Sequence, residues 1–217
     1  MFFSSSFCSM VYCLLENKTG ENKRVDMSLD YKNSAGKSDL GIIGGAEIKA
    51  IIGLGNPGSG YYRHRHSIGF RVVDALAKKL GAQWRERENM LLAEVQLGGH
   101  KVLLIKPQTF MNNSGKVISF LIKQGIEAKN ILVVHDELEL PFGDIKFKVG
   151  GSHKGHNGLK SIIAVCGPEF VRLRFGIGRP EDKAQVADYV LQNFSENADE
   201  IGRLIEKAVQ RLEELFS

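Results

Sequence analysis

Residues 131–141 read ILVVHDELELP, and this stretch decides the fold. Its four apolar residues, Ile131 to Val134, have the length and branched side chains typical of a buried strand. The polar pair His135 and Asp136 follows directly, so the strand delivers titratable side chains to its carboxyl end. Loops at the carboxyl ends of such strands usually carry the chemistry of an α/β protein. The sequence therefore predicts a central strand that leads into a functional site.

Strand-like and helix-like segments alternate around this run, from Glu47 to the end of the chain. Further strands are predicted at 48–54, 91–97, 102–105, 146–149 and 171–177. Helices are predicted at 68–80, 114–124, 159–165 and 196–216, where apolar residues recur at helical spacing. Strands separated by helices form a mostly parallel or mixed sheet covered on both faces. The predicted fold is α/β, a single domain with a twisted, mostly parallel mixed sheet flanked by helices.

Composition divides the chain into an extension, residues 1–46, and a patterned domain, residues 47–217. The extension has no basic residue before Lys18, so it lacks the charged start of a secretory signal and the arginines of a transit peptide. Its later part is polar with little periodicity, which favours disorder. We expect a disordered or non-native extension, and an upstream start codon, with translation beginning at Met27 or nearby, would explain it.

The cysteines and the apolar runs bear on the class of protein. Cys8, Cys13 and Cys166 form no C-x-x-C pair, which argues against a disulfide scaffold or a zinc site and fits a reducing compartment. No run approaches the roughly 18 apolar residues that a membrane span needs. At 217 residues the chain is long enough for one well-buried core and short for two.

Basic residues cluster in one region of a chain whose net charge is only +4. Between Ile145 and Pro180 a single acid, Glu169, is accompanied by Lys146, Lys148, Lys154, Lys160, Arg172, Arg174 and Arg179. Such a cluster is typical of a surface that binds a phosphate-bearing partner, although a solvated face is the alternative.

Residues 53–58, GLGNPG, contain the dinucleotide-binding pattern G-x-G-x-x-G directly after a predicted strand. No helix opens at Gly58, because Pro57 and the segment 59–62 intervene and helical spacing resumes only near Ile68. The acidic residue expected roughly 20 positions on, after a second strand, is also missing. A nicotinamide-dependent oxidoreductase is therefore disfavoured. Asn56 is either a turn former or an amide held rigidly at the end of a strand.

His66, in the segment RHRHSIGF, is the candidate general base, because an unperturbed imidazole titrates near neutral pH. A capping or surface histidine is the alternative. Asp136 is the candidate group that fixes the tautomer of the base. His135 and His156 compete for either role, and with Asp136 they also suggest metal ligands, although no H-E-x-x-H spacing supports a metal site.

Asn112 and Asn157 each precede a predicted helix, where an asparagine is a common N-cap. The alternative is functional, because amide side chains at loop tips donate hydrogen bonds to a carbonyl oxygen and accept them from water or from amide N–H groups. Together with Asn56, His66 and Asp136, these residues supply what is needed to hold a water, a carbonyl and a general base.

Seven ordered motifs make the chain resemble the bacterial-type peptidyl-tRNA hydrolase family. They are GLGNPG, RHSIGF, KPQTFMNNSG, VVHDELELPFG, GSHKGHNGLKSI, VRLRFGIGRP and VADYVL, and the resemblance covers the chain from about Lys49 to Leu191. The resemblance implies a three-layer α/β sandwich that hydrolyses the ester between a peptide and the terminal ribose of tRNA. It also implies no metal, no cofactor, and a cytoplasmic, usually monomeric protein whose partner is peptidyl-tRNA.

The resemblance assigns a chemical role to each candidate residue. His66 matches the general base that activates water, and Asp136 matches the carboxylate that orients it. Asn56 and Asn112 match amides that hold the peptide and the region of the ester carbonyl, and Asn157 matches an amide associated with a bound water and the substrate.

The resemblance also implies residues that bind the two ends of the substrate. Tyr61 aligns with a tyrosine near the tRNA end of the cleft, and Met111 aligns with a residue of the cleft wall. Lys146, Lys148 and Arg174 match basic positions that meet tRNA phosphates, in agreement with the charge cluster.

The chain departs from the family pattern at Ser67, which commonly is Asn, at Lys154, in a loop usually richer in glycine, and at Phe142, which frequently is proline. None of these departures removes a catalytic group. A chloroplast splicing factor shares the family's fold and binds protein and RNA without the enzymatic role, so a non-catalytic RNA-binding protein is the alternative function. The complete set of amides with His66 and Asp136 favours an enzyme.

Overall fold

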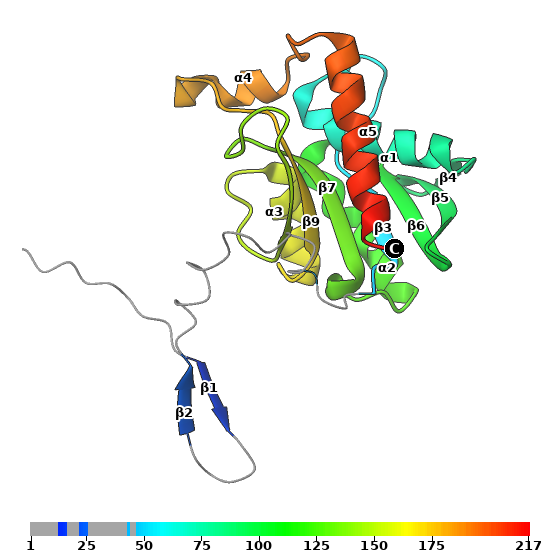
Figure 1. Ribbon diagram of the computed structural model, residues 1–217, viewed down its shortest axis with the longest axis vertical. Helices are drawn as coiled ribbons and strands as arrows, with labels where there is room; N and C mark the ends of the chain where they lie inside the picture. Colours follow the sequence, from blue (N-terminus) through cyan, green and yellow to red (C-terminus); the bar gives the residue numbers. More distant parts are fainter. Residues whose placement is uncertain (1–12, 17–21, 26–42, 44–46) are drawn as a thin grey trace, which may run out of the picture. The chain divides into compact units, whose positions relative to one another are not determined.

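The computed structural model describes residues 13–16, 22–25, 43 and 47–217 (Figure 1). The chain forms two compact units, Met1–Ser38 and Asp39–Ser217. In the first unit, β1 (Cys13–Glu16) pairs with β2 (Asn22–Val25) in an antiparallel arrangement that the sequence patterns do not predict. Most of the predicted extension lies outside the described residues, so its disorder and its origin stay predictions.

A seven-stranded sheet forms the centre of the second unit, with the strand order β4-β5-β6-β3-β7-β9-β8. Its strands are β3 (Ala50–Gly53), β4 (Arg85–Arg87), β5 (Met90–Leu97), β6 (His100–Pro107), β7 (Ile131–Glu137), β8 (Ile145–Val149) and β9 (Val171–Gly176). The adjacent strands β6, β3, β7 and β9 are parallel, whereas β4, β5 and β8 pair antiparallel toward the edges. The predicted α/β fold with a mixed sheet is confirmed.

Helices cover both faces of this sheet, as Figure 1 shows. On one face lie α1 (Ile68–Lys79) and α5 (Ala198–Glu214), and on the other lie η3 (Met111–Val117), α2 (Ile118–Lys123) and α3 (Asn157–Cys166). Alternate residues of β7 enter two separate cores. Leu132 and Val134 belong to the core beneath α1 and α5, whereas Ile131 and Val133 belong to the core beneath α2 and α3. The apolar run is continuous because both faces of the strand are buried.

A glycine at the end of β3, Gly53, and one in the first turn of α1, Gly69, allow the two elements to pack closely. A Cβ on Gly69 would lie 2.3 Å from the carbonyl oxygen of Val134, and a Cβ on Gly53 would lie 2.4 Å from the carbonyl oxygen of Gly69. The glycines therefore bring the first turn of α1 against β3 and β7. Since α1 begins at Ile68, no helix follows Gly58 directly, as the sequence predicts.

The segment after β6 is the clearest difference from the predicted elements. A single helix is expected at 114–124, but a 3-10 helix, η3, begins earlier and passes into the short α2. Gly115 explains the change, because its backbone N–H donates to Ser161 Oγ at 2.9 Å and leaves no room for a side chain against α3. Five further short elements are not predicted: the edge strand β4, η2 (Arg65–Ser67), η4 (Ala128–Asn130), η5 (Lys183–Gln185) and α4 (Val186–Val190).

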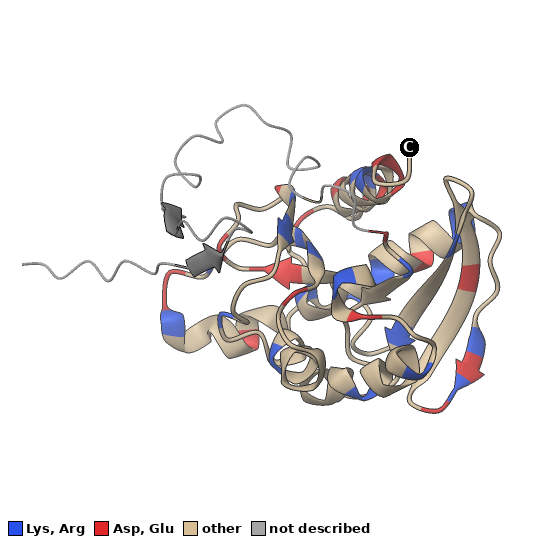
Figure 2. Cartoon of the chain, turned by 90° about the horizontal axis from the view of Figure 1, so that it is seen from below, with Lys and Arg blue, Asp and Glu red and all other residues tan. Residues whose placement is uncertain are grey.

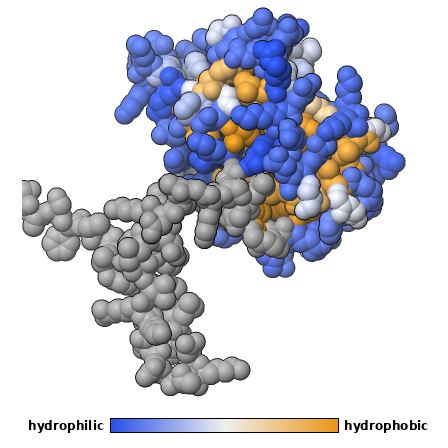
Figure 3. Space-filling model, in the orientation of Figure 1, coloured by the Kyte–Doolittle hydropathy of each residue, from blue (hydrophilic) through white to orange (hydrophobic). Residues whose placement is uncertain are grey.

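The surface of the described residues is mostly hydrophilic on the face seen in Figure 3, with apolar patches between the polar regions. Within the described part of the chain, no helix combines the length and the hydropathy that a membrane crossing requires.

Candidate active site

The carboxyl end of β7 carries the centre of the candidate site. Asp136 is the penultimate residue of β7 and is 4% exposed. His66 lies in η2, just before α1, and is 8% exposed. His66 Nδ1 lies 3.0 Å from Asp136 Oδ1 and 3.1 Å from Oδ2. Because a carboxylate only accepts, Nδ1 carries the proton and Nε2 keeps its lone pair. The pairing predicted from the sequence is present.

A second histidine shares the same carboxylate. His156 Nε2 lies 3.1 Å from Asp136 Oδ1, and the Nδ1 atom of His156 accepts the backbone N–H of Gly158 at 3.1 Å. Since Nδ1 is an acceptor, the proton of His156 lies on Nε2 and is donated to Asp136. The sequence leaves the role of His156 open, and the structure makes it the N-cap of α3 as well as a partner of Asp136.

Burial and these contacts shift the pKa values of the centre. Burial favours a raised pKa for Asp136, but the attraction and hydrogen bonds of His66 and His156 outweigh it and hold that pKa well below its ordinary value. Burial lowers the pKa of His66, but the charge and hydrogen bond of Asp136 outweigh burial and raise it. Asp136 is therefore ionised, and His66 is a stronger base than a free imidazole.

His135 plays a different part. Its Nδ1 atom donates to the backbone carbonyl of Asp136 at 2.7 Å, and complete burial lowers its pKa to about 3. A neutral ring held in this way is not the general base. Its edge contacts the ring of His156, with 5.2 Å between centroids.

Asn56 joins three loops of the site. Its Oδ1 atom accepts the backbone N–H of Met111 at 2.9 Å, and its own backbone N–H donates to Ser67 Oγ at 3.2 Å. The side-chain oxygen is therefore used inside the protein, which leaves the NH₂ group for a substrate. Ser67, one of the departures from the family pattern, anchors the Asn56 loop beside the base.

Neither Asn112 nor Asn157 is an N-cap. The cap of η3 is Phe110, without a side-chain hydrogen bond, and the cap of α3 is His156. Both asparagines are exposed, so their amides are accessible. The capping alternative from the sequence is wrong at both positions.

A hollow of about 450 Å³ opens beside the His66–Asp136 pair. We call it the basic hollow, because six cations line it against three acids, Asp136, Glu137 and Glu139; the cations are Lys148, Lys154, Arg172, Arg174, Arg179 and Lys183. Glu137 pairs with Arg174 and Glu139 with Arg179, so the excess of positive charge comes from the lysines and Arg172. Burial, followed by the positive charges of Arg174, Lys154 and Arg172, lowers the pKa of Lys148. Cations that repel one another in this way are relieved by an anionic ligand.

The residues predicted to bind substrate are distributed unevenly around this hollow. Lys148, Arg174 and Asn157 line it, whereas Lys146 does not and pairs with Asp144 at 2.9 Å. Met111 is only 5% exposed and does not line the basic hollow, so its interpretation as a wall residue gains no support there.

Tyr61 also stands apart from the basic hollow, next to an aromatic residue that the sequence analysis missed. Tyr61 is 39% exposed, and its ring meets Phe110, which is 58% exposed, edge to face at 6.1 Å. Phe110 lies within the KPQTFMNNSG motif, and this position was its only signal in the sequence.

A family model described as peptidyl-tRNA hydrolase matches residues 50–217. The chain belongs to the peptidyl-tRNA hydrolase family. The peptidyl-tRNA hydrolase of Sulfurovum sp. (strain NBC37-1) is 50% identical over 158 residues, which cover 71% of this chain and 82% of the relative. That of Wolbachia sp. subsp. Drosophila simulans (strain wRi) is 46% identical over 167 residues, covering 75% and 90%. The resemblance stated from the seven motifs is confirmed.

Solved structures of peptidyl-tRNA hydrolases agree with the fold. The crystal structure of the Acinetobacter baumannii enzyme is similar with a TM-score of 0.71 at 38% identity, and it covers 78% of this chain and 86% of that chain. Membership of the peptidyl-tRNA hydrolase family does not favour the non-catalytic RNA-binding alternative.

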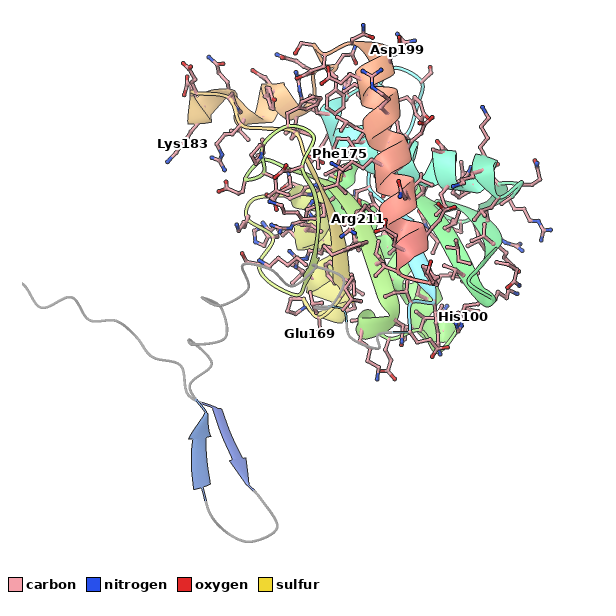
Figure 4. All side chains as sticks on the ribbon, viewed as in Figure 1. His100, Glu169, Phe175, Lys183, Asp199 and Arg211 are labelled. Carbon is pink, nitrogen blue, oxygen red and sulfur yellow. The ribbon has the colours of Figure 1, made fainter. Side chains whose placement is uncertain are left out.

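The outer wall of the basic hollow comes from a segment that the sequence analysis did not assign to the site. Lys183, at the outer end of η5 in Figure 4, lines the hollow together with Ala187 and Val190 of α4. This segment contains VADYVL, one of the seven motifs on which the family resemblance rests. The presence of this motif was the only sign in the sequence that the segment belongs to the site.

Arg65 attaches this segment to the turn that holds the base. Its guanidinium stacks over the ring of Tyr189 at 4.1 Å and donates to the Tyr189 carbonyl and to Ser195 Oγ, both at 3.3 Å. Its backbone N–H donates to the carbonyl of Gln192 at 3.0 Å. Since Arg65 is 4% exposed and precedes His66, the hollow's wall and the base share one buried anchor.

His66, Asp136 and His156 bring one possible metal-ligand atom each to within 4.8 Å of one another. In the structure, the ring nitrogens nearest the carboxylate already share hydrogen bonds with it. This arrangement is the one expected for a general base with its orienting carboxylate, so hydrogen bonding accounts for the cluster.

Proposed function

We propose that this chain hydrolyses the ester bond between peptide and tRNA in peptidyl-tRNA, with His66 as the general base, Asp136 as its orienting carboxylate, and no metal or cofactor. The observation that carries the proposal is the buried His66–Asp136 hydrogen bond at the edge of a basic hollow. Family membership supplies the substrate class.

The reaction follows from the tautomer of His66. Its free Nε2 takes a proton from water while the water oxygen bonds to the ester carbonyl carbon. Asp136 stabilises the resulting imidazolium, and the donated N–H of His156 keeps the carboxylate in place. When the bond from the carbonyl carbon to the ribose oxygen breaks, His66 returns the proton to that oxygen. The products are a peptide acid and a ribose hydroxyl.

The amide side chains of the site are proposed to hold the acyl group of the substrate. The NH₂ group of Asn56 and the exposed amides of Asn112 and Asn157 donate to carbonyl oxygens and so stabilise developing negative charge. Such groups also hydrogen-bond a neutral peptide backbone and match a charged α-amine poorly. We therefore expect N-blocked aminoacyl-tRNA to be cleaved faster than free aminoacyl-tRNA, and equal rates contradict this point.

The basic hollow supports the binding of the tRNA end. Lys148 and Arg174 are proposed to contact phosphates, as is Lys146 at the edge. Tyr61 is retained as a proposed substrate contact near the tRNA end of the cleft, and Met111 as a proposed residue of the cleft wall. Contacts to phosphates do not depend on base sequence, so tRNAs of any sequence are recruited. We further propose that residues 47–217 form the catalytic domain and that the protein is a cytoplasmic monomer.

The test is the release of N-acetylated amino acid from acylated tRNA by the intact chain and by His66→Ala, with and without a chelator. We expect turnover that survives the chelator and falls by about 10²- to 10⁴-fold in the variant. Intact chain that binds tRNA without turnover would favour the non-catalytic alternative, and loss of turnover with the chelator would contradict metal independence.

A further inference from the structure

Two hollows meet at Asn157. Asn157 lines the basic hollow and also a groove of about 540 Å³ between η3, α2 and α3. Asn112 and Asn157 line the groove near the reacting centre, Lys116 and Lys160 line its sides, and the groove follows α3 as far as Val165. We name it the η3–α3 groove.

The walls of the η3–α3 groove are fixed by a direct contact between the two elements. Gly115 N donates to Ser161 Oγ at 2.9 Å, and a Cβ on Gly115 would lie 2.3 Å from the carbonyl oxygen of Ser161. Side chains at this contact are short or absent, so the spacing of the walls is set by backbone packing. The groove is therefore formed before any ligand arrives, as binding clefts usually are.

The η3–α3 groove is positively charged. Lys116 and Lys160 are exposed, and among the described residues that line the groove none is acidic. An adjacent hollow of about 340 Å³ shares Lys116 with the groove and adds Arg87 and Lys123 against a single acid, Glu88. A chain with acidic side chains is complementary to this surface.

The position of the groove favours the peptide over the RNA. Asn157 directly follows His156, whose Nε2 lies 3.1 Å from Asp136, so the groove begins beside the reacting centre. Peptidyl-tRNA carries an anionic nucleic acid on one side of the ester and a peptide on the other. Since the basic hollow is the larger cluster of cations and suits phosphates, the η3–α3 groove, which shares Asn157 with it, is left to the peptide.

We propose that the η3–α3 groove receives the peptide of peptidyl-tRNA, and that Lys116 and Lys160 favour peptides with acidic side chains near the ester. This inference rests on the proposed function. From Asn157 to Val165, α3 rises by roughly 12 Å. An extended peptide covers that length in about four residues, so acidic side chains within about four positions of the ester are the ones that count.

The experiment compares two substrates on the same tRNA, an N-acetylated run of glutamates followed by alanine, and its isosteric counterpart with glutamines. The quantity measured is the ratio of their kcat/KM values, glutamate over glutamine. For exposed ion pairs we expect about a 1.5- to 5-fold preference per lysine in the intact chain. The preference falls as salt is added, because exposed charges are screened.

Variants then separate the groove from the rest of the surface. In the double variant Lys116→Glu and Lys160→Glu the ratio falls below one, and in the milder Lys116→Gln and Lys160→Gln pair it approaches one. The matched control is Lys207→Glu on α5, a helix whose surface carries both acidic and basic residues in Figure 2. This control keeps the ratio of the intact chain.

Three results overturn the inference. A ratio of one in the intact chain overturns the inference but not the proposed function, because both substrates are still hydrolysed. A double variant that loses both substrates and N-acetylalanyl-tRNA equally shows that the lysines contact RNA. An intact chain that cleaves none of the substrates overturns the proposed function and the inference with it.

Discussion

At the scale of single residues, the site depends on one carboxylate that serves two histidines. Asp136 Oδ1 lies 3.0 Å from His66 Nδ1 and 3.1 Å from His156 Nε2. In the resting state the three side chains together carry one negative charge. When His66 takes a proton, their net charge becomes zero while Asp136 stays ionised. The buried carboxylate therefore favours the proton transfer on which hydrolysis depends.

Replacing the carboxylate tests this electrostatic role. We expect Asp136→Asn to lower kcat by about 10²- to 10⁴-fold. In the native chain Asp136 raises the pKa of His66 above 6.5, so activity is lost as the pH falls through that raised value. Without the negative charge, burial dominates and lowers the pKa of His66, so the inflection of kcat/KM against pH moves to lower pH. An inflection of kcat/KM at the same pH in Asp136→Asn contradicts the conclusion that Asp136 raises the pKa of His66.

Strand alternation makes part of this residue set predictable from sequence. Leu132 and Val134 face the core under α1, and Asp136 continues the same face, so it meets His66 at the start of α1. The second partner is not predictable in this way. His156 reaches Asp136 only because of the path of the loop between β8 and α3, and no periodicity encodes that path.

At the scale of elements, the N-terminus of α3 is coupled to the chemistry through its cap. His156 accepts backbone N–H groups at the start of α3 with Nδ1 and contacts Asp136 with Nε2. One side chain thus both ends the loop and orients the carboxylate. The position of Asn157, which is the next residue, depends on the same cap.

Two substitutions separate these functions of His156. His156→Ala removes both, so we expect about 1 kcal/mol of lost stability and a lower kcat. His156→Asn keeps a good N-cap but is too short to reach Asp136 in the same way, so kcat falls while the melting temperature stays near the native value. Thermal unfolding and single-turnover kinetics on the same samples separate the effect on stability from the effect on kcat. A native kcat in His156→Asn contradicts the orienting role.

Arg65 attaches α4 and the segment that follows it. We expect Arg65→Ala to destabilise the chain by about 2 kcal/mol, because it removes the stacking on Tyr189 and two hydrogen bonds. KM for acylated tRNA rises because the outer wall of the basic hollow is no longer anchored. Arg65→Lys keeps the charge without the planar fork and gives an intermediate effect. Native KM in Arg65→Ala refutes the anchoring role.

Element positions were predictable where apolar periodicity is strong. The strand at 131–134 and the helix at 68–80 correspond closely to β7 and α1. The helix predicted at 114–124 is divided between η3 and α2, and the close contact of Gly115 with Ser161 in η3 is a tertiary constraint that no periodicity encodes. Short elements such as α4 contain too few residues to show a period.

At the scale of the whole molecule, basic residues gather around the basic hollow although the net charge is small. The chain carries a net charge of only +4, yet six lysines and arginines line the basic hollow. The sequence predicts this cluster because most of its members lie between Ile145 and Pro180. It does not predict the contribution of Lys183, which folding brings from the next segment.

Salt dependence follows from this distribution. The logarithm of kcat/KM for acylated tRNA is expected to fall linearly with the logarithm of salt concentration. Lys148→Ala makes the slope shallower by roughly 0.7 to 0.9, the value for one phosphate contact. Lys207→Ala, on the mixed surface of α5, leaves the slope unchanged. An unchanged slope in Lys148→Ala removes that lysine from the set of phosphate contacts.

The contacts between Arg65 and Tyr189 join the wall of the basic hollow to the turn that carries the general base. Any motion that swings α4 away from the sheet must break the contacts of Arg65 or displace Arg65, and His66 is the next residue of the chain. The wall of the basic hollow and the general base are therefore mechanically coupled, so a substitution that loosens α4 also disturbs the alignment of His66.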